Sequence, residues 1–191
     1  VDDRQFIKVR LNGAYTKNKY NRLYTENEQR SLSNVDEDLY SFDAFLGYNY
    51  KPNEKNSLYT KITHFHNITS TNYGGDYFSL QHLWEGETLL ATEYTHTFNK
   101  KVMAIFAPGV SWINYKLRGQ DLQEIWNLRL NTGVRCSLDS KQWLFLIFAL
   151  GNNQPDISYL NTANQTIDFY QIKRGNPYLD NTQIYTIFGM Y

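Results

Sequence analysis

The segment His64-Phe65-His66 contains the side chains of this chain best suited to metal binding. On a β-strand, residues i and i+2 point to the same face, so His64 and His66 would lie side by side. Two imidazoles are too few for a zinc site, which needs three or four converging protein ligands. His82 and His96 lie elsewhere in the sequence. We therefore expect ordinary strand histidines, with no metal and no cofactor.

Three carboxylates, Glu85, Glu87 and Glu93, could supply the acid and the base of a glycosidase. Their spacing singles out no pair, so we expect solvated carboxylates or carboxylates inside a barrel. The sequence contains no G-x-S-x-G and no H-E-x-x-H motif. Gly74-Gly75 indicates a turn, without the strand-to-helix context of a phosphate-binding loop. The prediction is that the chain is not an enzyme and has no catalytic residues.

The composition narrows the class of protein further. Lys+Arg and Asp+Glu both number 19, and this balance argues against a nucleic-acid partner. Aromatic residues make up 16% of the chain, with 16 tyrosines, and tyrosine suits surfaces that are wet on one side and apolar on the other. Cys136 is the single cysteine, so no intrachain disulfide can form. No run of 18 apolar residues predicts a transmembrane helix.

Apolar and polar residues alternate with a period of two along most of the chain, which is typical of β-strands. Pro108 is expected to break or bulge its strand, because proline has no N–H for the ladder. The segment 77–98 is expected to form one long strand or two strands interrupted near Glu85-Gly86. The expected strands are 6–16, 39–51, 57–69, 77–98, 102–117, 124–138, 143–150 and one starting near 184.

The alternation assigns residues to faces. Ile7, Val9, Leu11 and Tyr15 share one face of the first strand, opposite Lys8, Arg10 and Asn12. In 39–51, the tyrosines, Phe42, Ala44 and Leu46 share a face, and Phe45 is an exception among the polar residues opposite. The clearest pattern places Trp126, Leu128, Leu130, Thr132, Val134, Cys136 and Leu138 together. Alternation does not say whether such a face contacts lipid or an internal core.

The predicted strands are long, roughly 12–16 residues, whereas strands of soluble domains average about 5–6 and tilted membrane-spanning strands need about 9–11. Short connections are expected at 51–56, 99–101 and 139–142, and longer polar loops at 17–36, 70–76 and 151–165. Short turns at one end and long loops at the other are typical of outer-membrane barrels.

Two further groups of residues fit this architecture. Arg129 and Arg135 would point into the barrel and pair with carboxylates or water there; a selectivity or plug-docking contact is the functional alternative. The tryptophans lie near expected strand ends, as in the aromatic girdles at membrane interfaces. The competing interpretation is a sugar-stacking platform in a soluble β-sandwich. These tryptophans are Trp84, Trp112, Trp126 and Trp143.

Two segments carry a family resemblance. Residues 50–59, YKPNEKNSLY, look like strand–turn–strand segments of outer-membrane barrels of Bacteroidetes. Residues 174–191, RGNPYLDNTQIYTIFGMY, resemble the R-x-G-N-P-x-L-K-P-E segment of TonB-dependent receptor-like barrels, although Asp180-Asn181 replace the usual Lys-Pro. Such barrels have roughly 22 strands and a plug. The resemblance implies that residues 1–191 are a single incomplete segment of about eight antiparallel strands in an up-and-down meander, without the plug domain, and that Tyr191 is a cut.

The resemblance also implies a function: nutrient uptake through the cell outer membrane. The implied partners are outer-membrane lipid, the plug domain and the energy-transducing TonB complex, and a surface lipoprotein is compatible with it. Residues 17–36 and 151–173 would be the loops that contact substrate, but the sequence specifies neither the substrate nor its ligand-binding residues. The alternative is a stand-alone small β-barrel or β-sandwich that binds a ligand or a carbohydrate.

Overall fold

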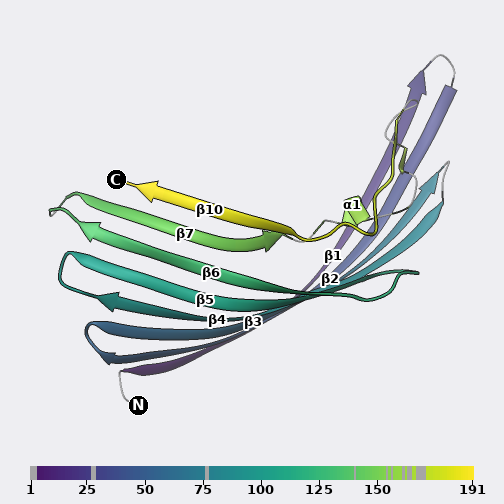
Figure 1. The fold of residues 1–191 in the computed structure, drawn as a ribbon. Helices are drawn as coiled ribbons and strands as arrows, with labels where there is room; N and C mark the ends of the chain where they lie inside the picture. The colour runs from purple at the N-terminus through teal and green to yellow at the C-terminus, as the bar shows by residue number, and fades with distance from the viewer. Residues whose placement is uncertain are drawn as a thin grey trace.

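The structure, a computed structural model, describes residues 4–26, 29–75, 78–139, 141–153, 155, 157–160, 162, 165–166 and 171–191. Nearly all of them belong to one antiparallel sheet of eight strands, in which each strand pairs with the next along the chain (Figure 1). The all-β meander predicted from the sequence is therefore confirmed. Its strands are β1 (Gln5–Glu26), β2 (Gln29–Asn53), β3 (Asn56–Gly75), β4 (Ser79–Thr97), β5 (Val102–Leu117), β6 (Gln123–Ser137), β7 (Trp143–Asn153) and β10 (Thr182–Met190).

The sheet is open. Its order runs from β1 to β10, and within the described residues no register joins these two strands. The long connection 154–181, with the single-turn helix α1 (Ile157–Leu160) and the small pair β8 (Gln165–Thr166) and β9 (Ile172–Lys173), joins β7 to β10. The two edge strands thus each carry one row of peptide groups without a ladder partner in the sheet.

Three short turns lie at one end of the sheet, on the left in Figure 1, where short connections were predicted. Each turn uses one Asn or Asp side chain to accept backbone N–H groups. Asn53 Oδ1 accepts from Lys55 at 3.0 Å, and Asn99 Oδ1 accepts from Val102 at 3.0 Å. Asp139 Oδ1 accepts from residues 141 and 142 at 2.7 and 2.8 Å. Such side-chain turns explain why these connections are short and polar.

At the opposite end, the prediction of a long loop at 17–36 is wrong. Strands β1 and β2 stay paired to Glu26–Gln29 and form a long arm, at the upper right of Figure 1. The Nζ atom of Lys17 lies 3.7 Å from Oδ1 of Asp38, and the Nζ atom of Lys19 lies 3.3 Å from Oδ1 of Asp36. These ion pairs lie in a hairpin whose apolar cross-strand pairs, Tyr20–Val35 and Leu23–Leu32, fall on opposite faces, so the regular apolar alternation that indicates strands is missing. The segment 70–76 is likewise mostly strand, since β3 continues to Gly75.

Where one strand or an interrupted pair was expected, β4 is a single strand from Ser79 to Thr97, and Glu85-Gly86 do not interrupt it. The predicted break or bulge at Pro108 is also wrong, because β5 is continuous and keeps one register with β6 throughout. On the β4 side, pairing stops at Ala91–Gly109 and resumes at Tyr94–Phe106 in the same register. Proline therefore interrupts one ladder locally without inserting a residue.

Gly75 ends β3 with a φ of +107°, a conformation that residues with a side chain rarely adopt. A Cβ atom there would lie 2.1 Å from the Leu32 carbonyl oxygen. We expect Gly75→Ala to lower the free energy of unfolding by about 1–3 kcal/mol in a denaturant titration. Gly74→Ala is the matched control, because a Cβ at Gly74 finds its nearest atom 4.0 Å away. Equal effects of the two substitutions would contradict the assignment of strain to Gly75.

The sequence after β7 was expected to be a polar loop, followed by a new strand from the Asn176-Pro177 turn. β7 extends to Asn153, and the connecting segment then reaches a turn in which Leu179 N donates to Asn176 O at 3.4 Å. The Asn176 side chain accepts from the backbone N–H of Tyr178 at 3.0 Å. The new strand is β10, as predicted.

This connecting segment covers part of one face of the sheet and forms the core there. Tyr115 donates from its hydroxyl group to the carbonyl oxygen of Leu179 at 3.1 Å. Ile125 and Leu179 pack against the core from its edge. Its fully packed members are Leu83, Ile113, Tyr115, Leu117 and Leu160. Four of them come from β4 and β5 and alternate in sequence, so they share one face.

Candidate functional site

The register divides the sheet into two unlike faces. One row of directly paired residues crosses six strands and consists of Val9, Leu46, Ile62, Leu90, Val110 and Leu128. We call the face that carries this row the apolar face. It continues over β7 and β10 with Leu150 and its partner Tyr185. Leu11 and Leu128 on this face are 66% and 74% exposed. The apolar face therefore runs without a gap across all eight strands and remains uncovered over most of its area.

The opposite face, which we call the polar face, carries most of the charged side chains outside the β1–β2 arm; in that arm Lys17, Lys19, Asp36 and Asp38 lie on the apolar side. The buried side chains of the sheet lie on it, with Asn114 as the exception. Lys8 and Arg10 lie over the ring of Phe45, with their charged groups 5.9 and 5.4 Å from its centroid. These cation–π contacts explain why an aromatic residue interrupts the polar alternation of β2.

Aromatic pairs lie toward the ends of the apolar face. Tyr15 and Tyr40 have ring centroids 4.8 Å apart, and Trp112 and Trp126 have centroids 6.1 Å apart. His66 contacts Trp84 edge-on at 4.6 Å. At the end with the short turns, His96 contacts Phe98 at 4.5 Å and Tyr94 at 6.3 Å. Trp84, Trp112 and Trp126 thus lie on the apolar face.

Trp143 does not share this placement. It pairs with Ser137 and lies on the polar face, where the guanidinium carbon of Arg135 is 5.6 Å from its ring centroid. The sequence analysis assigned Trp143 to a girdle because it follows a turn. Successive residues of a strand point to opposite faces, however, so Trp143 lies on the face opposite to that of Leu144. Arg135 therefore stacks on an aromatic ring and is not in one of the ion pairs found among the described residues.

Arg129 is held by three partners on the polar face. Its Nη2 atom forms an ion pair with Glu87 Oε1, and its Nε atom donates to Ser111 Oγ at 3.3 Å. Its Nη1 atom donates to the carbonyl oxygen of Asn152 at 3.5 Å. The side chains of Arg129 and Glu87 are 22% and 13% exposed. The predicted pairing of an interior arginine with a carboxylate is present, and it ties β4 to β6 across β5.

The histidines form hydrogen bonds with different partners and do not converge on one point. His64 and His66 share a face, as expected, with ring centroids 6.2 Å apart. His64 Nδ1 shares a hydrogen bond with Thr88 Oγ1 at 2.9 Å, and His82 Nδ1 shares one with Ser70 Oγ at 2.8 Å. Among the described residues, no group of three or more His, Cys, Asp or Glu side chains is arranged to hold a metal ion.

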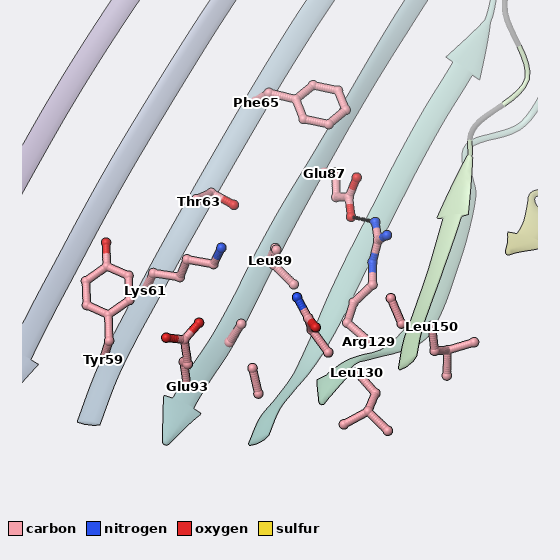
Figure 2. Close-up of a pocket in the computed structure, with 14 residues that line it drawn as sticks. Tyr59, Lys61, Thr63, Phe65, Glu87, Leu89, Glu93, Arg129, Leu130 and Leu150 are labelled. Carbon is pink, nitrogen blue, oxygen red and sulfur yellow. Dashed lines mark hydrogen bonds and ion pairs between the residues drawn. The ribbon is translucent and has the colours of Figure 1, made fainter. Parts of the chain in front are cut away.

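All three candidate glutamates lie on the polar face. Glu85 accepts a hydrogen bond from Asn67 Nδ2 at 3.1 Å, and Glu87 pairs with Arg129. Glu87 and Glu93 both line a groove of about 400 Å³ that crosses β3 to β7 (Figure 2). The three carboxylates therefore have different surroundings: Glu85 is not among the residues that line the groove, Glu87 is held in its ion pair with Arg129, and Glu93 is in none of the ion pairs among the described residues.

The groove also contains residues that the sequence analysis did not select. Tyr59, Lys61, Thr63 and Phe65 line it from β3, and Glu87 and Glu93 line it from β4. The residues from β3 alternate in sequence, so their common face could have been read from the pattern. The sequence pattern does not give the register between β3 and β4. This register places Lys61 opposite Ala91 and Tyr59 opposite Glu93.

Within the part of the chain that the structure describes, no helix is long and apolar enough to cross a membrane. Comparisons of the chain with protein-family models, with curated proteins and with solved structures found no match.

Proposed function

We propose that this chain forms part of the wall of a larger β-barrel in an outer membrane, of the type found in TonB-dependent receptors, and contributes to nutrient uptake. The observation that carries the membrane assignment is the uncovered apolar face, which is continuous over eight strands. Water-soluble proteins rarely leave so large an apolar surface exposed. A barrel wall in lipid alternates apolar outward and polar inward residues in this way.

The aromatic residues of the apolar face support a membrane wall. Trp84, Trp112 and Trp126 lie on the same face as the apolar row, where side chains would contact lipid.

The open edges support the larger assembly. In the hydrocarbon core, peptide groups without partners cost several kcal/mol each, so spanning sheets have to close. Further strands would continue the sheet at β1 and β10, with lipid outside and the plug domain against the polar face. The uptake function, the TonB complex and a surface lipoprotein as partners rest on the resemblance of residues 174–191 alone.

A small soluble barrel that binds a ligand has less support. In such a barrel the apolar face would line the interior. The buried side chains Leu83, Ile113 and Leu117 lie on the opposite face, under the segment that leads to β10. The burial therefore favours the polar face as the inner one.

Quenching of single tryptophans by brominated lipid tests the membrane assignment. One variant keeps Trp126, which is 68% exposed on the apolar face, and another keeps Trp143 on the polar face; phenylalanine replaces the other tryptophans. Both are reconstituted into phosphatidylcholine vesicles with bromine atoms near the headgroup end of the acyl chains. We expect strong quenching of Trp126 and at least twofold weaker quenching of Trp143, because only the apolar face would contact lipid.

The same vesicles without bromine give the reference intensity for each variant. Equal quenching of the two tryptophans, or stronger quenching of Trp143, would reverse the proposed orientation of the sheet. Absence of quenching in both variants, with the chain recovered free of the vesicles, would refute the membrane assignment.

A further inference from the structure

The groove on the polar face has alanine side chains at its base and larger side chains along its sides. Ala91, Ala107 and Ala149 contribute the floor from three strands, and Leu89 lies beside it. The ladder between β4 and β5 is interrupted at this point, opposite Pro108. The small side chains at these three positions leave space above the sheet, and the volume of about 400 Å³ is within the range of small-molecule sites.

The charges of the groove are balanced but only half of them are paired. Arg129 and Glu87 neutralise each other at one end. At the other end, Lys61 and Glu93 are half-buried and face the same groove, and neither takes part in an ion pair among the described residues. In Figure 2 the Lys61 side chain extends from β3 toward Leu89, and Glu93 rises from β4 on the same side of the groove.

The separation of these two charges follows from the register. Lys61 is opposite Ala91, so Glu93 is its diagonal neighbour, with Cβ atoms roughly 7–8 Å apart. Long side chains can meet across that distance, yet here they leave one free ammonium and one free carboxylate at the same opening. A ligand with a single charge would satisfy one group and leave the other unpaired in a partly desolvated site.

We propose that the groove binds a small zwitterion, a molecule with one ammonium and one carboxylate group. Lys61 pairs with the ligand carboxylate and Glu93 with the ligand ammonium. Tyr59 and Phe65 form the wall beside the ligand, and the Arg129–Glu87 pair closes the far end. This site goes beyond the proposed function, because it requires the polar face of the sheet and not the lipid contact of the apolar face.

Titration calorimetry with the full chain in detergent micelles tests the site. The probes are glycine, triglycine, and triglycine with an acetylated N-terminus and an amidated C-terminus. We expect binding of at least one of the two zwitterions and no binding of the blocked peptide, which lacks both charges. Binding of glycine alone would identify a single amino acid as the ligand class, and binding of triglycine alone a short peptide.

Substitutions assign the two charges. Lys61→Met and Glu93→Gln should each weaken binding at least tenfold, about 1.4 kcal/mol. Lys55→Met and Glu54→Gln remove the same charge types from the exposed turn between β2 and β3 and should leave affinity unchanged. Circular dichroism confirms that each variant keeps its sheet.

Equal binding of the blocked and unblocked peptides, or no binding of either zwitterion to the unsubstituted chain at millimolar concentration, would overturn the proposal. The comparison of blocked and unblocked probes needs no substitution, so it decides the matter even where a variant does not fold. A negative result here would leave the tryptophan-quenching test untouched, since that test measures lipid contact only.

Discussion

Leu11→Arg is expected to lower the free energy of unfolding from a lipid bilayer by about 2–4 kcal/mol, the cost of an arginine on the lipid face near the bilayer midplane. Leu11 is 66% exposed on the apolar face and lies four residues from Tyr15 in the aromatic pair at one end and four from Ile7 toward the other. In lipid the guanidinium would replace an acyl-chain contact by a charge in hydrocarbon. In a sheet whose apolar face meets water, the same substitution would be almost neutral.

Asn12→Arg is the matched control for this substitution. Asn12 is the next residue on β1, is exposed, and lies on the polar face opposite Asp43. An arginine there gains a cross-strand carboxylate, so we expect a change within about 0.5 kcal/mol. Denaturant titrations of both variants in phosphatidylcholine vesicles, followed by tryptophan fluorescence, give the two values. Losses of similar size for Leu11→Arg and Asn12→Arg would show that the faces do not differ in their surroundings.

Arg129→Met is expected to lower the free energy of unfolding by about 2–3 kcal/mol, somewhat less than the ~3–5 kcal/mol typical of breaking a fully buried pair. The substitution leaves Glu87 with 13% exposure and without its countercharge. It also removes the donors to Ser111 Oγ and to the Asn152 carbonyl oxygen. Because these partners lie on three strands, the loss is expected as a lower denaturation midpoint of the whole sheet.

The double variant Arg129→Met with Glu87→Gln separates the uncompensated charge from lost packing. We expect it to recover at least half of the loss, because the glutamine carries no charge to be desolvated. Arg135→Met provides the reference for an arginine that stacks on Trp143, and its expected cost is below about 1 kcal/mol. If the double variant were as unstable as Arg129→Met, the pairing with Glu87 would not be the source of the stability.

The alternation of side chains was sufficient to predict the two faces of the sheet. Residues that share a face in sequence, such as Ile7 with Val9 and Trp126 with Leu128, share it in the structure, because a strand has a fixed period of two. The strand β10 was also predictable, since Asn176-Pro177 gives the turn before it a specific geometry. Local chemistry therefore accounts for most of the meander.

Pairing between strands was not predictable from the same signals. The arm of β1 and β2 has no apolar stripe in its sequence, so its strands could not be predicted from alternation. Their pairing is apparent only from cross-strand contacts such as Lys17 with Asp38 and Lys19 with Asp36. The groove likewise depends on which residue of β4 lies opposite Lys61. These contacts join residues far apart in sequence, and single-strand periodicity contains no information about them.

The arm formed by β1 and β2 fixes a distance. From Tyr15 to Glu26 the strand spans eleven residues, and at about 3.3 Å per residue the arm reaches up to about 36 Å beyond the Tyr15–Tyr40 pair. This length is comparable to the roughly 30 Å hydrocarbon core of a bilayer. A flexible loop of the same residues would spread its tip over a wide volume near its base. The paired strands, with β3 alongside as far as Gly75, instead hold the tip at a fixed direction and height relative to the rest of the sheet.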